Sequence, residues 1–172
     1  MEDPQVSDDG VAHDSTASAI EVVKYRPQFR DAFVRLNTEW IERYFAIEAR
    51  DVAVFEDVEG HILAPGGMIF FVVAGDVPLG TCAMVVEGPG VFQLAKMAVD
   101  PSARGRGYGD LLIDAALRWA EARGAVRVEL LSNTMLAPAI SLYRKHGFVE
   151  EPFVARPGYA RTNVKMALAI PR

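Results

Sequence analysis

Residues Val99–Gly109 read VDPSARGRGYG, and they predict the end of a strand, a tight turn and a glycine-rich loop that opens directly into a helix. Gly105, Gly107 and Gly109 can adopt backbone conformations that other residues avoid, and without a Cβ atom they let an anion approach the main chain. The first N–H groups of the following helix lack partners within the helix and point outward at the positive end of its dipole. The loop therefore predicts a binding site for a pyrophosphate.

The side chains around the glycines narrow the kind of phosphate site. Arg104 and Arg106 can add charge-assisted contacts to a phosphate. A dinucleotide-binding fingerprint counted from Gly105 and Gly107 needs a third small residue where Asp110 stands, so this fingerprint does not fit. A nucleotide-binding P-loop needs Gly-Lys-Ser/Thr, and the sequence has neither that triplet nor its spacing.

On both sides of the loop the chain alternates between strand and helix patterns, which predicts a mixed α/β fold. The elements expected before the loop are a strand at 20–24, a helix from 27 to 41, a second helical stretch at 44–54, a loop at 61–67 and strands at 68–74, 77–87 and 91–99. Those expected after it are a helix at 107–123, a strand at 126–131, a helix at 138–146 and strands at 149–154 and 163–170.

Composition and charge exclude several classes of protein. The five acidic residues within 1–18 account for the whole net charge of −5, so we expect a flexible acidic tail at 1–18 and one neutral domain at 19–172. A neutral domain offers no basic surface for nucleic acid, and the longest apolar run, Met68–Ala74, is far too short to span a membrane. The single cysteine, Cys82, and the lack of a signal-peptide pattern predict a cytoplasmic protein.

Two motifs together resemble one known family. The pattern Arg104-x-x-Gly107-x-Gly109 after a strand is similar to the Arg/Gln-x-x-Gly-x-Gly/Ala motif of the GCN5-related N-acetyltransferase (GNAT) superfamily. Asn133, followed by a helix that ends Tyr143-Arg144-Lys145-His146-Gly147-Phe148, resembles the second motif of that family. The order of the expected elements also matches over residues 19–170.

The resemblance implies a fold and a cofactor. The GNAT fold is a twisted mixed sheet of about seven strands with helices on both faces, in which strands four and five splay apart and acetyl-CoA lies between them. The residues that the resemblance assigns to acetyl-CoA are Met97, Ala98, Val99, Arg104, Gly105, Arg106, Gly107, Tyr108, Gly109, Asn133 and Tyr143. Asn133 also suits a turn or a helix entry, which leaves its role open.

The resemblance implies two catalytic groups and leaves the general base open. A bulge in strand four is expected to turn the Met97 N–H toward the thioester oxygen, and Tyr143 is expected to protonate the departing thiolate. Many relatives carry a glutamate where this chain has Gln93, which cannot accept a proton usefully but can position a water. The alternative bases are a chain of waters or one of three glutamates, namely Glu39, Glu48 or Glu87.

The acceptor site is expected near the first helices and the last loop. Glu39, Trp40 and Tyr44 lie in the helical region that forms one wall of the acceptor site in this family, and Arg161 lies in the loop before the last strand, where it can hold a substrate carboxylate. The simpler explanations of the same residues are an amphipathic helix packed on the sheet and solvated loop charges. The three histidines are too scattered to predict a metal site.

The expected function is therefore transfer of acetyl from acetyl-CoA to a primary amine, by direct attack in a ternary complex. The aromatic first helices favour a small-molecule acceptor, and a homodimer is common in the family. Two alternatives stay open: an acetyltransferase that modifies protein lysines or N-termini, and a module that binds acyl-CoA without catalysis.

Overall fold

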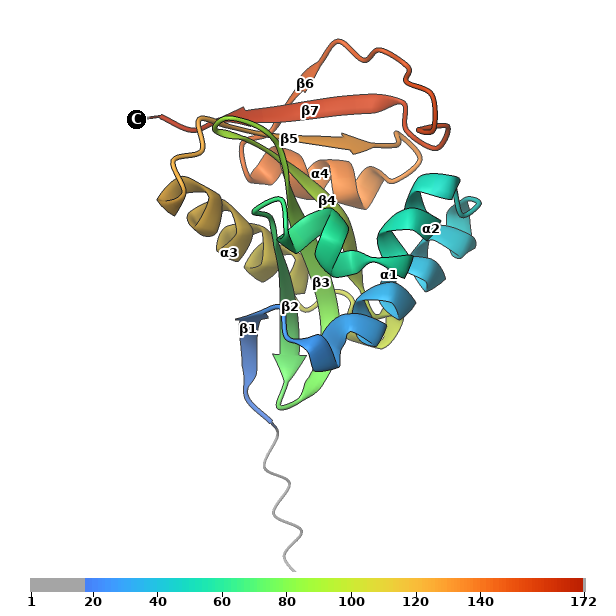
Figure 1. Cartoon of the computed structure of the whole chain (residues 1–172), viewed down its shortest axis with the longest axis vertical. Coiled ribbons are helices and arrows are strands. Elements are labelled where there is room, and N and C mark those ends of the chain that lie inside the picture. The colour runs from blue at the N-terminus through green and yellow to red at the C-terminus, as the bar shows by residue number, and fades with distance from the viewer. Residues whose placement is uncertain (1–17, 172) are drawn as a thin grey trace, which may run out of the picture.

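The computed structural model describes residues 18–171, so the tail predicted at 1–18 lies outside the described residues apart from Ser18 (Figure 1). Seven strands form one mixed sheet in the order β1-β2-β3-β4-β5-β7-β6. The strands are β1 (Ile20–Lys24), β2 (Met68–Ala74), β3 (Val77–Gly88), β4 (Val91–Val99), β5 (Arg127–Ser132), β6 (Val149–Glu151) and β7 (Val164–Ala169). The helices are α1 (Arg30–Tyr44), α2 (Ala49–Glu56), α3 (Tyr108–Ala122) and α4 (Ala137–Lys145), with short turns η1 (Pro27–Phe29), η2 (Glu59–Leu63) and η3 (Pro101–Ala103). No helix within 18–171 is long and apolar enough to cross a bilayer.

The sheet has helices on both faces, as the fold prediction required. Figure 1 shows α1 and α2 on one side of β2–β4 and α3 on the other, while β5–β7 cross the top with a strong twist. Successive residues of β2 explain this arrangement, because alternate side chains of a strand point to opposite faces. Ile69 and Phe71 pack with Phe33 of α1, whereas Phe70 and Val72 pack with Leu112 of α3. A strand buried on both faces needs an unbroken apolar sequence, and β2 has one.

Strands β4 and β5 run side by side only at their first residues. They are the one parallel pair in the described sheet, and their register covers Val91–Gln93 against Arg127–Glu129. Beyond Gln93 no further pairing between them is found in residues 18–171. The splayed strands four and five predicted from the sequence are therefore present, and the gap opens toward the end of β4 that leads into the glycine-rich loop.

Two predictions about the segment before β2 were wrong. The helical stretch expected at 44–54 is interrupted, because α1 ends at Tyr44 and the chain is extended at Glu48 before α2 begins. The Asp51 carboxylate accepts a hydrogen bond from the Glu48 N–H at 2.9 Å, which satisfies a free donor at the start of α2. The loop expected at 61–67 overlaps η2, a π-helical turn, because Val58 and Ile62 are both buried in the core beneath it.

One strand is shorter than predicted. The strand expected at 149–154 ends at Glu151, and the next residue is Pro152. Proline has no N–H to donate to a neighbouring strand, so pairing with β7 stops there. The segment that follows, residues 152–163, leaves the sheet and returns at Val164. We call it the β6–β7 loop, and it forms part of the site described next.

Candidate active site

Two cavities meet at the end of β4. The loop cavity, of about 460 Å³, lies beside the glycine-rich loop, the start of α3 and one side of α4. The charged cavity, of about 270 Å³, lies between α1, α2, β4, the end of β5 and the β6–β7 loop. Four residues line both cavities and form the neck between them: Trp40, Met97, Leu136 and Tyr143.

The glycine-rich loop has the conformation that the sequence predicted. Gly105 and Gly107 have positive φ angles of 74° and 79°, and a Cβ atom at either position would meet nothing within 4 Å. Gly107 is the residue immediately before α3, so the free N–H groups of the first turn follow it directly. Gly109 has a different role, because a Cβ there would lie 2.8 Å from the Leu142 side chain and 3.1 Å from Met97. It lets α3 approach α4 and β4 closely.

The structure brings most of the residues expected at acetyl-CoA to the loop cavity. Met97, Ala98, Val99, Arg104, Gly105, Gly107, Tyr108, Gly109 and Tyr143 line this cavity. Arg106 is exposed and does not line it. Asn133 lines the charged cavity instead, and its side chain accepts from the Met135 N–H and donates to the Arg161 carbonyl, both at 2.9 Å. It thus fills the turn role that the sequence left open, while its contact with the cofactor stays a prediction.

The bulge expected in strand four lies at Lys96. Between the cross-strand pairs Thr81–Ala98 and Ala83–Ala95, β4 has one residue more than β3. Lys96 has a φ of 51° and is the one residue other than glycine with a positive φ in the described chain. A left-handed backbone at such a residue costs about 1–2 kcal/mol, so the surrounding structure has to hold it. The oxyanion role of Met97, the next residue, remains a prediction.

Tyr143 extends from α4 into the neck between the cavities. Its ring contacts Phe148 edge to face, with centroids 6.2 Å apart at an angle of 65°. Burial raises the pKa of Tyr143 to about 12. The phenol is therefore protonated at neutral pH and available as a hydrogen-bond donor to a group in the neck.

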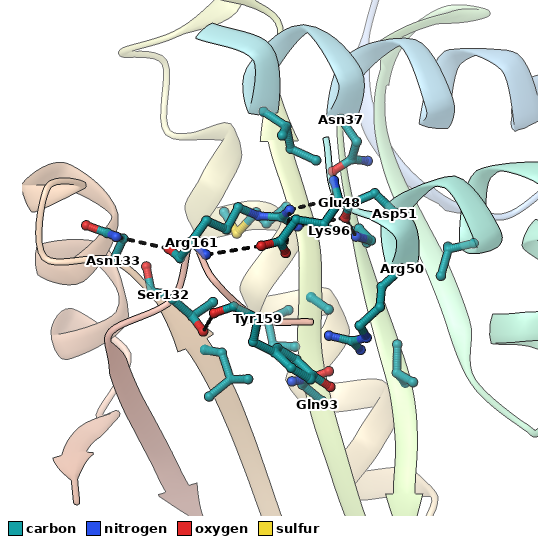
Figure 2. A pocket seen from close by; sticks show the side chains of 18 of the residues that line it. Asn37, Glu48, Arg50, Asp51, Gln93, Lys96, Ser132, Asn133, Tyr159 and Arg161 are labelled. Atoms are coloured by element: carbon teal, nitrogen blue, oxygen red, sulfur yellow. Dashed lines mark hydrogen bonds and ion pairs between the residues drawn. The ribbon is translucent and has the colours of Figure 1, made fainter. Parts of the chain in front are cut away.

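The charged cavity contains a buried ion network that sequence reasoning missed (Figure 2). Asp51 of α2 is 1% exposed and contacts Lys96 of β4 and Arg161 of the β6–β7 loop. The Arg161 guanidinium also lies 3.2 Å from the Glu48 carboxylate. Burial alone would raise the pKa of Asp51, but hydrogen bonds from Arg161 and Lys96 outweigh it and hold this pKa well below its usual range. One signal was available in the sequence: a lysine in the strand VFQLAKMAV, where every other residue except Gln93 is apolar.

The same cavity holds a second buried polar side chain, Asn37 of α1. Its amide nitrogen donates to the Phe33 carbonyl at 2.9 Å, which fixes its orientation. Its Oδ1 is buried without a hydrogen-bond partner among residues 18–171. A buried acceptor without a partner costs about 1–3 kcal/mol, so a donor in this cavity would be stabilised there.

The predicted acceptor residues separate into two groups. Trp40 lies in the neck, Tyr44 lines the loop cavity and Arg161 lines the charged cavity. Glu39 lines neither, since its exposed carboxylate contacts Arg35 at 3.4 Å. The Arg161 guanidinium is already held by carboxylates of the protein, so it forms part of the cavity wall.

The candidate general bases are also separated. Gln93 and two of the three glutamates named from the sequence, Glu48 and Glu87, line the charged cavity.

Within residues 18–171 no group of three His, Cys, Asp or Glu side chains is placed to hold a metal ion. Cys82 is buried in the core against α3, and burial raises the pKa of its thiol above the ordinary range.

Comparisons with known proteins agree with this geometry. An uncharacterized N-acetyltransferase of Schizosaccharomyces pombe is 32% identical over 149 residues, which cover 81% of this chain and 88% of that protein. An uncharacterized N-acetyltransferase of Methanocaldococcus jannaschii is 38% identical over 69 residues, and there the match spans only 30% of the relative's length and 40% of this chain.

Solved structures share the fold at low sequence identity. An acetyltransferase of the GNAT family from Staphylococcus aureus has a TM-score of 0.79 at 18% identity, over 88% of this chain and 99% of that one. The PaiA N-acetyltransferase of Thermoplasma acidophilum, solved with coenzyme A, has a TM-score of 0.72 at 14% identity, over 88% and 99%. The sequence profile of the acetyltransferase (GNAT) family matches residues 29–148. This match covers more than half of the chain and includes both motifs, and on this evidence the chain belongs to the acetyltransferase (GNAT) family.

Proposed function

We propose that this protein transfers an acetyl group from acetyl-CoA to the primary amine of a small molecule. The observation that carries the proposal is the meeting of two cavities at Met97 and Tyr143. A ternary complex needs one space for the donor and one for the acceptor, with the reacting atoms at their junction. The neck formed by these residues with Trp40 and Leu136 is that junction.

The residues of the loop cavity fit acetyl-CoA. The open space at Gly105 and Gly107 and the free N–H groups of the first turn of α3 suit a pyrophosphate, and Arg104 adds a positive charge. The gap between β4 and β5 leaves main-chain groups of Met97–Val99 without strand partners on that side, so they can pair with the amides of an extended arm. When bound, the cofactor supplies an acetyl thioester.

The protein's own groups then act at the neck. Met97 follows the bulge and lines both cavities, and its N–H can stabilise negative charge on an oxygen in the neck. Tyr143 is protonated and can donate a hydrogen bond to the departing sulfur. With Gln93 at the position where relatives carry a carboxylate, the amine loses its proton through water or through a glutamate of the charged cavity.

The size of the acceptor space supports a small molecule. The charged cavity measures about 270 Å³ and is bounded by two helices, the sheet and the β6–β7 loop. Ligand pockets for small molecules span roughly 300–1,000 Å³, so this cavity suits a compact acceptor better than a protein segment. A groove for a lysine on a protein would need an open side next to the neck.

The test is thiol release from acetyl-CoA against amino acids, polyamines, aminoglycosides, arylamines and short peptides. We expect turnover with at least one small amine and none with the peptides. Turnover of peptides alone would replace the small-molecule acceptor by a protein acceptor. Silence across the panel, with coenzyme A binding still seen by calorimetry, would contradict the proposed catalysis and favour a binding module.

A further inference from the structure

Asp51 connects three segments of the chain that are distant in sequence. Its Oδ2 accepts from the Glu48 N–H at 2.9 Å, and its Oδ1 accepts from Arg161 Nη2 at 2.7 Å. The same carboxylate pairs with the Lys96 ammonium. It is the one carboxylate among residues 18–171 that is almost fully buried. Two of these bonds tie the start of α2 to other parts of the site, namely β4 and the β6–β7 loop, and the third lies within the start of α2 itself.

The bond to Lys96 connects Asp51 to strand β4. Lys96 occupies the bulge of β4, in a left-handed backbone conformation that glycine would adopt at lower cost. A lysine there is useful because its side chain gives the bulge an anchor, which glycine lacks. Burial lowers the pKa of Lys96, although the Asp51 carboxylate opposes this shift. The Lys96 side chain is 15% exposed, and its ammonium pairs with the Asp51 carboxylate.

The bond to Arg161 connects Asp51 to the β6–β7 loop, which lines part of the charged cavity. The guanidinium makes two contacts with Asp51 and one with Glu48, and the Arg161 main-chain N–H donates to Glu48 at 3.3 Å. Two residues before it, Tyr159 stacks under the Arg50 guanidinium, with 3.5 Å between the guanidinium carbon and the ring centroid. The β6–β7 loop is thus fastened to α2 at two points.

We infer that Asp51 is a positioning residue for acetyl transfer, which holds the β4 bulge through Lys96 and the β6–β7 loop through Arg161 in one fixed arrangement. The inference rests on the proposed function, because the bulge precedes Met97, which lines the neck, and the β6–β7 loop lines the acceptor space. The carboxylate is suited to this because two cations converge on it. Replacing it leaves both cations buried with only Glu48 near one of them, so the two segments that carry these cations lose their common anchor.

A purely structural role predicts a different result from a positioning role. If Asp51 only stabilised the fold, its removal would make every segment open more often, and hydrogen exchange would rise throughout the chain. If it positions the site, exchange rises in the bulge and in the loop while α3, which packs on the other face, keeps its protection. The variant is Asp51→Asn, which keeps the shape and removes the charge.

The experiment is hydrogen–deuterium exchange of the full chain, read in peptides covering 94–99, 155–163 and 108–122. For Asp51→Asn we expect roughly tenfold or faster exchange in the first two segments and unchanged exchange in the third. The matched control is Asp57→Asn at the end of the same helix, whose carboxylate bonds the Gly60 N–H on an exposed surface. It should leave 94–99 and 155–163 as in the unmodified protein. A uniform rise over all three segments, or no rise in either of the first two, overturns the inference.

Two further variants test the ion pairs to Lys96 and Arg161 separately. They also test the inference if Asp51→Asn does not fold. Lys96→Met should accelerate exchange in 94–99 alone, and Arg161→Met in 155–163 alone. Unchanged exchange in the matching segment shows that Asp51 does not hold it. With an acceptor in hand, Lys96→Met should lower kcat about tenfold with little change in the acceptor KM. The exchange measurements need no acceptor. If no amine in the panel is acetylated, the proposed function is contradicted, but the inference about Asp51 is still decided by hydrogen exchange.

Discussion

Gln93 lies directly opposite Glu129, in the last register position at which β4 and β5 run side by side. Paired residues of adjacent strands point to the same face, so the two side chains are neighbours. The Glu129 carboxylate also contacts Lys165 at 2.5 Å. An amide at position 93 therefore sits beside an existing carboxylate without adding a second negative charge. This neighbour gives a physical reason for an uncharged side chain at position 93.

Gln93→Glu should destabilise the fold in a pH-dependent way. The introduced carboxyl would face Glu129, and a nearby like charge raises its pKa in the folded state. Such a group costs nothing while it is protonated, and the penalty develops as the pH rises above its ordinary value near 4.3. We expect a loss of up to about 1 kcal/mol at pH 7 that disappears near pH 4, measured by urea unfolding. Gln93→Met, which adds no charge, is the control. A loss of equal size at both pH values would refute the explanation.

Gly107→Trp should abolish coenzyme A binding without unfolding the protein. Nothing lies within 4 Å of a Cβ at this position, so the side chain would occupy the space where the pyrophosphate is proposed to bind. Gly124, after α3, is a matched control because it has a φ of 76° and the same open surroundings far from the loop. By calorimetry we expect Gly107→Trp to weaken binding at least about 100-fold, or 2.8 kcal/mol, and Gly124→Trp to leave it unchanged. Equal affinity in both folded variants would show that the loop does not bind the cofactor.

Tyr143→Phe should lower kcat while acetyl-CoA affinity stays the same. The variant keeps the ring packed on Phe148 and removes the hydroxyl that reaches the neck. Loss of a proton donor in the transition state costs roughly 100-fold or more in rate. The measurement is steady-state turnover together with calorimetry of coenzyme A. Tyr25→Phe, which removes a hydroxyl bonded to Glu59 away from both cavities, should keep its turnover. An unaltered kcat in Tyr143→Phe would remove this residue from the mechanism.

The rate should not fall on the alkaline side below pH 10. Because burial raises the pKa of Tyr143 to about 12, its proton stays in place throughout that range. The acceptor amine gains its reactive neutral form as the pH rises, so kcat/KM should increase toward the pKa of that amine and then level off. The profile is measured by thiol release between pH 6 and about 10. A descending limb centred near pH 9 would mean that a different acid donates the proton.

The sequence predicted the parts of the site that depend on local chemistry. Gly105 and Gly107 are needed because the backbone has positive φ angles there, and such positions are visible in a glycine pattern. The unbroken apolar run of β2 likewise follows from burial on both faces. The bulge near Met97 was expected from the family resemblance, and the shifted register between β3 and β4 confirms it.

The ion network could not be predicted in the same way. Asp51 is 45 residues from Lys96 and 110 from Arg161, and no local pattern relates positions so far apart. Each residue alone reads as an ordinary charge on a helix, a strand or a loop. The interruption between α1 and α2, in contrast, has a local signal, because Glu48 and Asp51 form a capping box three residues apart.

The shared neck has a consequence for the donor as well as the acceptor. In the proposed reaction, an acyl chain longer than acetyl that starts in the loop cavity can extend only past Trp40 and Leu136 into the charged cavity. Each added methylene then takes volume from the same 270 Å³ that the acceptor occupies. A long acyl group and a bulky amine therefore cannot both be accommodated in this protein. Widening the neck would admit a longer acyl group and would leave less volume for the amine.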